Sequence, residues 1–154
     1  GKVISAGCET CGMSGADAGD LPATVSRSPD GDLDYRISFA VPTEIGPGVE
    51  RPVIVSAPEV ITRGSIFTVT YKGKVVTSVS MAAPCANTHS MNMNQRVLFL
   101  NLVSVSNGVA RVQAPPLSQP AAAHEGYYQL FLLGAHTIAG QTYSEGVWVK
   151  LVDK

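Results

Sequence analysis

Charged residues are scarce in this chain of 154 residues: Asp, Glu, Lys and Arg together make up 15%, and the formal net charge is −1. The 11 Lys and Arg residues are scattered singly, so the basic stripe that is typical of nucleic-acid binding is absent. No apolar run approaches the roughly 18 residues that a membrane-spanning helix needs. With 45% hydrophobic residues, the composition instead predicts one folded globular domain, with at most a short appendage.

The motifs of several enzyme classes are also missing. No glycine-rich phosphate loop, Gly-x-Ser-x-Gly turn or His-Glu-x-x-His helix occurs, which excludes the enzyme classes that depend on them. Asp30, Asp32 and Asp34 lie in a Gly- and Pro-containing segment, where Asp suits the local hydrogen bonds of a turn. No bidentate Glu follows at the spacing of a calcium loop, so acid–base and calcium chemistry are poorly supported there.

Cysteine is scarce too, with three residues: Cys8, Cys11 and Cys85. The Cys8-x-x-Cys11 spacing fits a redox-active pair, half of a zinc site or a local disulfide. A redox pair needs a βαβ context and a zinc site needs a second cysteine pair. Since neither is found, the spacing favours the disulfide of a secreted protein. Cys85 is then either a small buried thiol, a ligand or an intermolecular partner.

Short β-type segments separated by turns dominate the chain from Arg51 onward. They lie at residues 52–58, 65–73, 75–83, 95–108, 109–116, 126–135 and 146–153. Apolar and polar residues alternate in several of them, and Asn107-Gly108 is typical of a hairpin turn. About seven short strands in roughly a hundred residues predict an all-β, immunoglobulin-like β-sandwich. In this sandwich we expect Trp148 to pack in the core or between the sheets.

Residues 1–50 are different in character. Stretches rich in Gly, Asp, Ser and Pro, which indicate loops, surround two strand candidates at residues 2–6 and 34–41. Three prolines and two glycines over residues 42–52 then indicate a linker. We therefore divide the chain into residues 1–50 and 51–154. Because it begins with Gly1 instead of Met, we expect a processed chain or a part of a longer polypeptide.

One histidine and two methionines stand at alternate positions before an apolar run. In an extended chain His89, Met91 and Met93 would share one face, and imidazole with thioether suits copper. The pattern is therefore compatible with a self-contained copper site, although its chemistry favours inward packing of both methionines. His124 and His136 lie in turn-rich stretches and are expected at the surface.

An ordered set of motifs extends along most of the chain. It consists of Thr88-His89-Ser90, Asn94-Gln95-Arg96, Ala114-Pro115-Pro116 and the segment from Gly126 through Phe131. This set resembles the C-terminal domain of the galactose oxidase and glyoxal oxidase family of copper radical oxidases. Residues 51–54 are similar to the start of that domain. Residues 1–12 resemble the last propeller strand of those enzymes, where a Cys-x-x-Cys disulfide follows a glycine turn.

The resemblance implies a secreted protein in which an immunoglobulin-like early set (E-set) domain, residues 51–154, packs against a seven-bladed propeller. Residues 1–50 would then be loop-rich, with remnant propeller strands and a linker. It also implies that His89 is a copper ligand, that Gln95 and Arg96 support the loop or the interdomain contact, and that Cys8 and Cys11 form a disulfide.

In the family the other copper ligands lie in the propeller, which would precede Gly1. We therefore expect that this chain alone does not oxidise alcohols or aldehydes. Two other functions stay open. One is a non-catalytic extracellular module that contacts other chains or glycans in a larger assembly. The other is a β-sandwich copper carrier that uses His89, Met91 and Met93.

Overall fold

The computed structural model describes residues 3–6, 37–89, 91–137 and 140–153. The chain divides into two units, residues 1–42 and 43–154. In the first unit, strands β1 (Val3–Ala6) and β2 (Ile37–Ala40) pair antiparallel, with Val3 opposite Ala40. These strands confirm the two strand candidates in this part of the sequence. Cys8 and Cys11 lie outside the described residues, so their disulfide stays a prediction.

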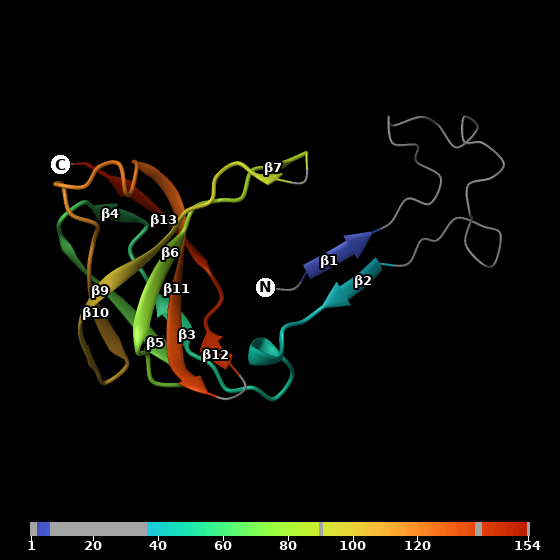
Figure 1. Cartoon of the computed structure of the whole chain (residues 1–154). Coiled ribbons are helices and arrows are strands. Elements are labelled where there is room, and N and C mark those ends of the chain that lie inside the picture. The colour runs from blue at the N-terminus through green and yellow to red at the C-terminus, as the bar shows by residue number, and fades with distance from the viewer. Residues whose placement is uncertain (1–2, 7–36, 90, 138–139, 154) are drawn as a thin grey trace, which may run out of the picture. The chain divides into compact units, whose positions relative to one another are not determined.

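The second unit is built of strands (Figure 1), and within its described residues the one helical element is the short 3-10 helix η2 (Thr43–Ile45). The strands are β3 (Val53–Ser56), β4 (Val60–Thr62), β5 (Ile66–Lys72), β6 (Ser78–Ala82), β7 (Asn87–Thr88), β8 (Met91–Asn92), β9 (Val97–Ser106), β10 (Val109–Gln113), β11 (Gly126–Thr137), β12 (Gly140–Tyr143) and β13 (Val147–Val152). Each of the seven predicted segments contains a strand, so the all-β prediction is confirmed. Among the described residues, no helix is long and apolar enough to cross a membrane.

Strand β9 joins the two layers of the sandwich. Its first half pairs with β6, where Leu100 lies opposite Val79, and its second half pairs with β10, where Asn101 lies opposite Gln113. Layer 1 has the strand order β3-β5-β10-β9, and layer 2 has the order β9-β6-β11-β13-β4 with β12 beside β11. A register shift between β9 and β10 indicates a bulge, which increases the local twist as the sheet curls around the core.

Alternation along the strands places the core between the two layers. In β5, Phe67 and Val69 are buried, whereas Ile66 and Thr68 are exposed. The wholly buried side chains of largest volume are Ile61, Met81, Leu130, Leu132 and Leu151. Each contributes about 1.5–3 kcal/mol through removal of apolar surface from water.

The turn between β9 and β10 confirms the hairpin predicted from Asn107-Gly108. Both residues have positive φ angles, 49° and 75°, as a type I′ turn requires. The amide of Tyr71 in the neighbouring β5 donates a hydrogen bond of 2.7 Å to the carbonyl of Gly108. The turn is therefore tied to layer 1 as well as to its own two strands.

Trp148 was predicted to pack in the core, and this prediction is wrong. Its side chain is 54% exposed. In β13 the alternation buries Val149 and Leu151, so Trp148 lies with Lys150 on the outer face of layer 2.

Candidate functional site

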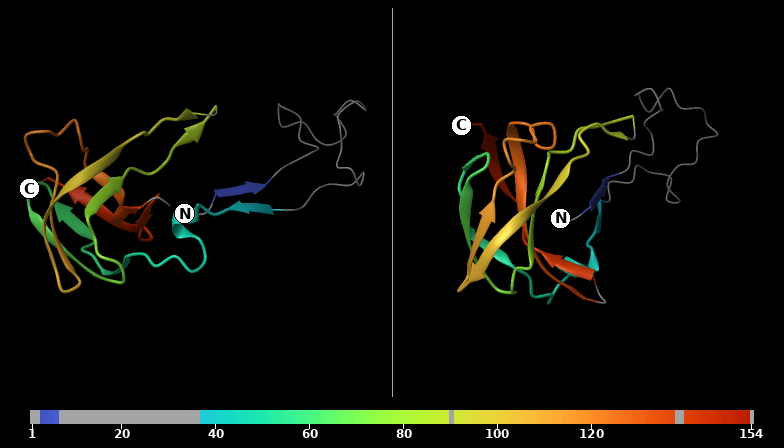
Figure 2. Two further views of the ribbon diagram at one scale, coloured as in Figure 1. Left: turned by 60° about the horizontal axis from the view of Figure 1, so that its bottom comes forward. Right: turned by 60° about the vertical axis from the view of Figure 1, so that its left-hand side comes forward.

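A two-stranded arm, residues 83–96, extends from the ends of β6 and β9 away from the sandwich (Figures 1 and 2). It continues the pairing of these strands, since the amide of Ala83 donates to the carbonyl of Arg96 at 2.9 Å. Farther out, β7 pairs with β8, with Thr88 opposite Met91. The arm is thus a β-ribbon rather than an irregular loop, and His89 lies in the turn at its tip.

Two asparagine side chains brace the arm near its base. The Oδ1 atom of Asn92 accepts hydrogen bonds from the backbone amides of Ala86 and Asn94, at 3.1 and 3.0 Å. The Nδ2 atom of Asn94 donates to the carbonyl of Pro84 at 2.9 Å. The bonds to Ala86 and Pro84 join the two strands, beside a backbone bond of 2.9 Å from the amide of Met93 to the carbonyl of Ala86.

His89 has a left-handed backbone conformation, with φ of 52°. Few residues other than glycine adopt this conformation, although His is more tolerant of it than β-branched residues. The imidazole is exposed, and its Nδ1 atom lies 2.8 Å from the hydroxyl oxygen of Thr88. In the tautomer whose Nδ1–H donates to this oxygen, Nε2 keeps its lone pair and can bind a metal ion.

Met91 and Met93 were expected to pack inward, and this prediction is wrong. Their side chains are 59% and 67% exposed, because the narrow arm has no second layer to cover them. Cys85, also in the arm, is an exposed free thiol. The interpretation of Cys85 as a buried thiol is therefore excluded.

Gln95 and Arg96 lie at the base of the arm, not beside its tip. Gln95 is exposed and stands four residues after Met91 in the sequence. Arg96 is half-buried and lines a groove of about 260 Å³ together with His124, Glu125 and Tyr127. Any influence of the pair on His89 would therefore pass through the backbone of the arm.

The other histidines lie outside the arm. His124 is exposed in the turn before β11, and its carbonyl accepts a 2.9 Å hydrogen bond from the hydroxyl of Tyr128. His136 is also exposed, but it lies within β11 opposite Gln141 rather than in a turn. Among the described residues, no group of three or more His, Cys, Asp or Glu side chains is placed to hold a metal ion. His89 can thus supply one ligand to a site that needs others.

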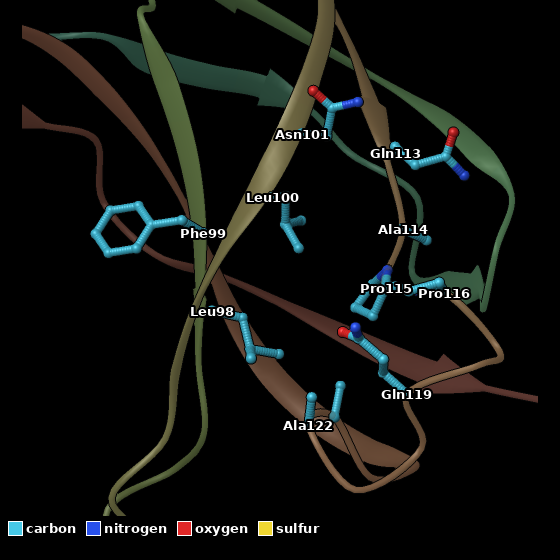
Figure 3. Close-up of a pocket in the computed structure, with 11 residues that line it drawn as sticks. Leu98, Phe99, Leu100, Asn101, Gln113, Ala114, Pro115, Pro116, Gln119 and Ala122 are labelled. Carbon is cyan, nitrogen blue, oxygen red and sulfur yellow. The ribbon is translucent and has the colours of Figure 1, made fainter.

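A separate cavity of about 240 Å³ opens beside β9 (Figure 3). Leu98 and Leu100 face it from β9, and Pro115, Pro116 and Gln119 close it from the segment after β10. Its polar lining residues are the amides Asn101, Gln113 and Gln119. The ring of Phe99 is directed away from the other residues that line the cavity.

Comparison with known proteins decides the family. Residues 51–151 match the family described as galactose oxidase-like, early set domain. The chain belongs to this family. The resemblance inferred from the Thr88-His89-Ser90 and Asn94-Gln95-Arg96 motifs is therefore confirmed, as is the immunoglobulin-like E-set fold.

Two relatives place this E-set domain in larger proteins. The chain is 31% identical over 132 residues to aldehyde oxidase GLOX1 of Arabidopsis thaliana, a match that covers 77% of this chain and 21% of the plant protein. A fungal alcohol oxidase of the AA5 family, solved in complex with copper, shares the fold with a TM-score of 0.62 and 23% identity. That match covers 90% of this chain and 27% of the fungal one. The chain thus spans about a quarter or less of either relative.

Sequence patterns alone did not reveal the bracing of the arm or its exposed side. The contacts of Asn92 depend on amides on both strands of the arm, which a linear motif does not display. A signal for one side was present, however, since Met91, Met93, Val97 and Phe99 all stand at odd positions of the sequence. In the structure every odd position from 91 to 99 is exposed.

Proposed function

We propose that this chain is the C-terminal E-set portion of a secreted galactose oxidase- or glyoxal oxidase-like protein, in which His89 is a copper ligand. The observation that supports this most directly is the braced arm, which carries an exposed imidazole with Nε2 available. A ligand presented in this way suits a site whose other ligands come from a neighbouring domain. Imidazole is also a preferred ligand of copper.

In this proposal the chain has a positioning role. Copper would supply the redox chemistry once it is bound by His89 and by ligands from a propeller domain. The arm holds the imidazole, Thr88 orients its ring, and the sandwich anchors the arm. Gln95 and Arg96 support the base of the arm or the interdomain contact, and Cys8 and Cys11 form a disulfide. The chain by itself does not oxidise substrate.

The test is a His89→Ala variant of the full-length protein. We expect it to lose most of its copper, measured by elemental analysis after dialysis, while the circular dichroism spectrum stays that of the wild type. His124→Ala is a matched control, because His124 is an exposed histidine outside the arm. Retained copper in His89→Ala would contradict the proposal. A wild-type protein that holds no copper would instead favour the alternative of a non-catalytic extracellular module.

A further inference from the structure

The turn between β9 and β10 contains a chemically reactive pair of residues. Of the five asparagines in the chain, Asn107 is the one that precedes a glycine. A backbone nitrogen can attack the side-chain amide of an asparagine directly before it, and a side chain on the attacking residue hinders the approach. Gly108 has no side chain. Its nitrogen is therefore the least hindered nucleophile beside any asparagine of this chain.

Both reacting groups of the turn are accessible. Asn107 is exposed. Among the residues that the structure describes, none forms a hydrogen bond with the side chain of Asn107 or with the amide of Gly108. The side chains of Asn92 and Asn94, in contrast, are hydrogen-bonded to the backbone of the arm. Water and hydroxide can thus reach the Asn107 amide without the loss of a hydrogen bond.

The backbone conformation of the turn opposes the attack. Asn107 has φ of 49° and Gly108 has φ of 75°, as in a type I′ turn. In such a turn ψ at the first central residue is about +30°. This value turns the nitrogen of Gly108 toward the backbone nitrogen of Asn107 and away from its Cβ atom. A ring that joins the Gly108 nitrogen to Cγ needs this nitrogen beside Cβ, so the turn must open first.

We infer that Asn107 is a site of spontaneous deamidation and that opening of the β9–β10 turn controls its rate. In the opened turn the nitrogen of Gly108 loses its proton to hydroxide and forms a bond to Cγ of Asn107. The Cγ–Nδ2 bond breaks, and Nδ2 takes a proton from water and leaves as ammonia, which regenerates the hydroxide. The product is a five-membered succinimide ring, and no group is oxidised or reduced.

Hydrolysis of this ring gives two products. Addition of water at Cγ restores the normal backbone and leaves aspartate at position 107. Addition of water at the backbone carbonyl carbon leaves isoaspartate, in which the main chain passes through Cβ and Cγ. Over the whole reaction one water molecule is consumed and one ammonia is released. Either product adds one negative charge, but isoaspartate also adds one carbon to the backbone.

The longer backbone of isoaspartate does not fit the contacts around this turn. The carbonyl of Gly108 accepts a hydrogen bond of 2.7 Å from the amide of Tyr71, and Val109 lies opposite Ser106 in β9 and Thr70 in β5. An additional backbone atom between Ser106 and Val109 displaces one side of these pairs. Formation of isoaspartate therefore loosens the hairpin, and the closed turn cannot form again.

Deamidation rates of the folded and the unfolded chain test this inference. The 154-residue chain is incubated in mildly alkaline buffer with and without urea, and peptide mass spectrometry with separation of aspartate and isoaspartate follows each asparagine. In urea we expect Asn107 to react about tenfold faster than Asn101, which precedes a leucine. Without urea we expect Asn107 to react about tenfold more slowly than in urea, because the turn must open locally. Equal rates at Asn107 and Asn101 in urea would overturn the site, and equal rates at Asn107 with and without urea would overturn control by the turn.

Two valine variants test the opening step without a change in the reacting residues. Val109→Gly weakens the strand beside the turn and should accelerate deamidation of Asn107 several-fold in the folded chain. Val60→Gly makes the same change in β4 of layer 2 and should leave this rate unchanged. Circular dichroism checks that both variants are folded. An equal effect of the two changes would contradict local control by the hairpin.

A third variant tests the effect of the product. Asn107→Gly cannot deamidate, and Gly-Gly also suits a type I′ turn. Its free energy of unfolding, measured with urea, should stay constant during an incubation in which that of the wild type falls as isoaspartate accumulates. Freshly prepared Asn107→Asp carries the added charge without the longer backbone and should be as stable as the fresh wild type. Unchanged stability of the isoaspartate-containing chain would refute the loosening of the hairpin.

Discussion

The hydroxyl oxygen of Thr88 lies 2.8 Å from Nδ1 of the neighbouring His89. A histidine that binds a metal through one nitrogen usually donates its other ring N–H to an acceptor, which sets the tautomer and the ring orientation. Thr88 can be that acceptor, because its hydroxyl oxygen has lone pairs. In that arrangement Nε2 keeps its lone pair and faces solvent at the tip of the arm.

Replacing Thr88 therefore tests how the ring is oriented. Thr88→Val keeps the shape of the side chain but removes the acceptor, and we expect the copper affinity of the full-length protein to fall by about tenfold. Thr88→Ser keeps the hydroxyl and should bind copper as the wild type does. Competition titration with a copper chelator measures both. Equal affinity in the Val and Ser variants would contradict a role for this hydrogen bond.

We expect the arm to loosen locally when the hydrogen bonds of the Asn92 side chain are removed. Asn92→Ala removes an acceptor shared by the amides of Ala86 and Asn94. We expect a loss of about 1 kcal/mol of local stability, which faster hydrogen exchange at these two amides would report. Asn92→Asp keeps an acceptor oxygen and should preserve their protection. Unchanged exchange in the Ala variant would show that the β7–β8 pairing is sufficient.

Copper titration of the 154-residue chain separates the ligand role from a copper carrier. We expect weak binding of Cu(I), because in the proposed function His89 is the one ligand that this chain supplies. A tight complex that is lost on replacement of Met91 and Met93 by Ala would establish the carrier instead.

We expect replacement of Arg63 to reduce stability more than the loss of a surface ion pair does. It is a buried arginine whose Nε lies 2.5 Å from Oδ1 of Asp153. We expect Arg63→Ala to lower the free energy of unfolding by about 2 kcal/mol, mainly through lost packing, because the Asp153 carboxylate is 49% exposed and stays solvated. Lys74→Ala breaks an exposed pair with Glu50 and should cost less than about 0.5 kcal/mol. Urea denaturation gives both values, and similar costs would contradict the importance of burial.

Gly108 and Gly48 have similar positive φ angles, but we expect their replacement by Ala to reduce stability by different amounts. At Gly108, with φ of 75°, a Cβ atom would lie 2.7 Å from the carbonyl oxygen of Tyr71, whereas at Gly48, with φ of 79°, it would meet nothing within 4 Å. Gly48→Ala should cost about 1 kcal/mol for the backbone conformation alone. Gly108→Ala should cost more because of the added clash. Thermal unfolding of the two variants would show whether their stabilities differ.

Much of the sandwich could be predicted from local patterns. Alternation along Ile66–Lys72 and the Asn107-Gly108 turn depend on neighbours in the chain, and both are found as expected. The short strands β4, β7, β8 and β12 were missed, because two to four residues contain too little periodicity. A signal that Trp148 is exposed was available, since Trp148 and Lys150 are two positions apart in β13 and therefore lie on the same face. The prediction followed the tendency of tryptophan to be buried instead.

Residue types in a fixed order were enough to predict the family and the all-β class, and to select His89 as the candidate ligand. The tertiary structure was needed to show that Leu100 and Asn101, adjacent in β9, pair with strands of different layers. It was also needed to show that the even-numbered side chains of residues 91–99 are half-buried, whereas Met91, Met93, Val97 and Phe99 are exposed. The physical reason is that exposure depends on which distant strands cover a face, and cross-strand register sets this.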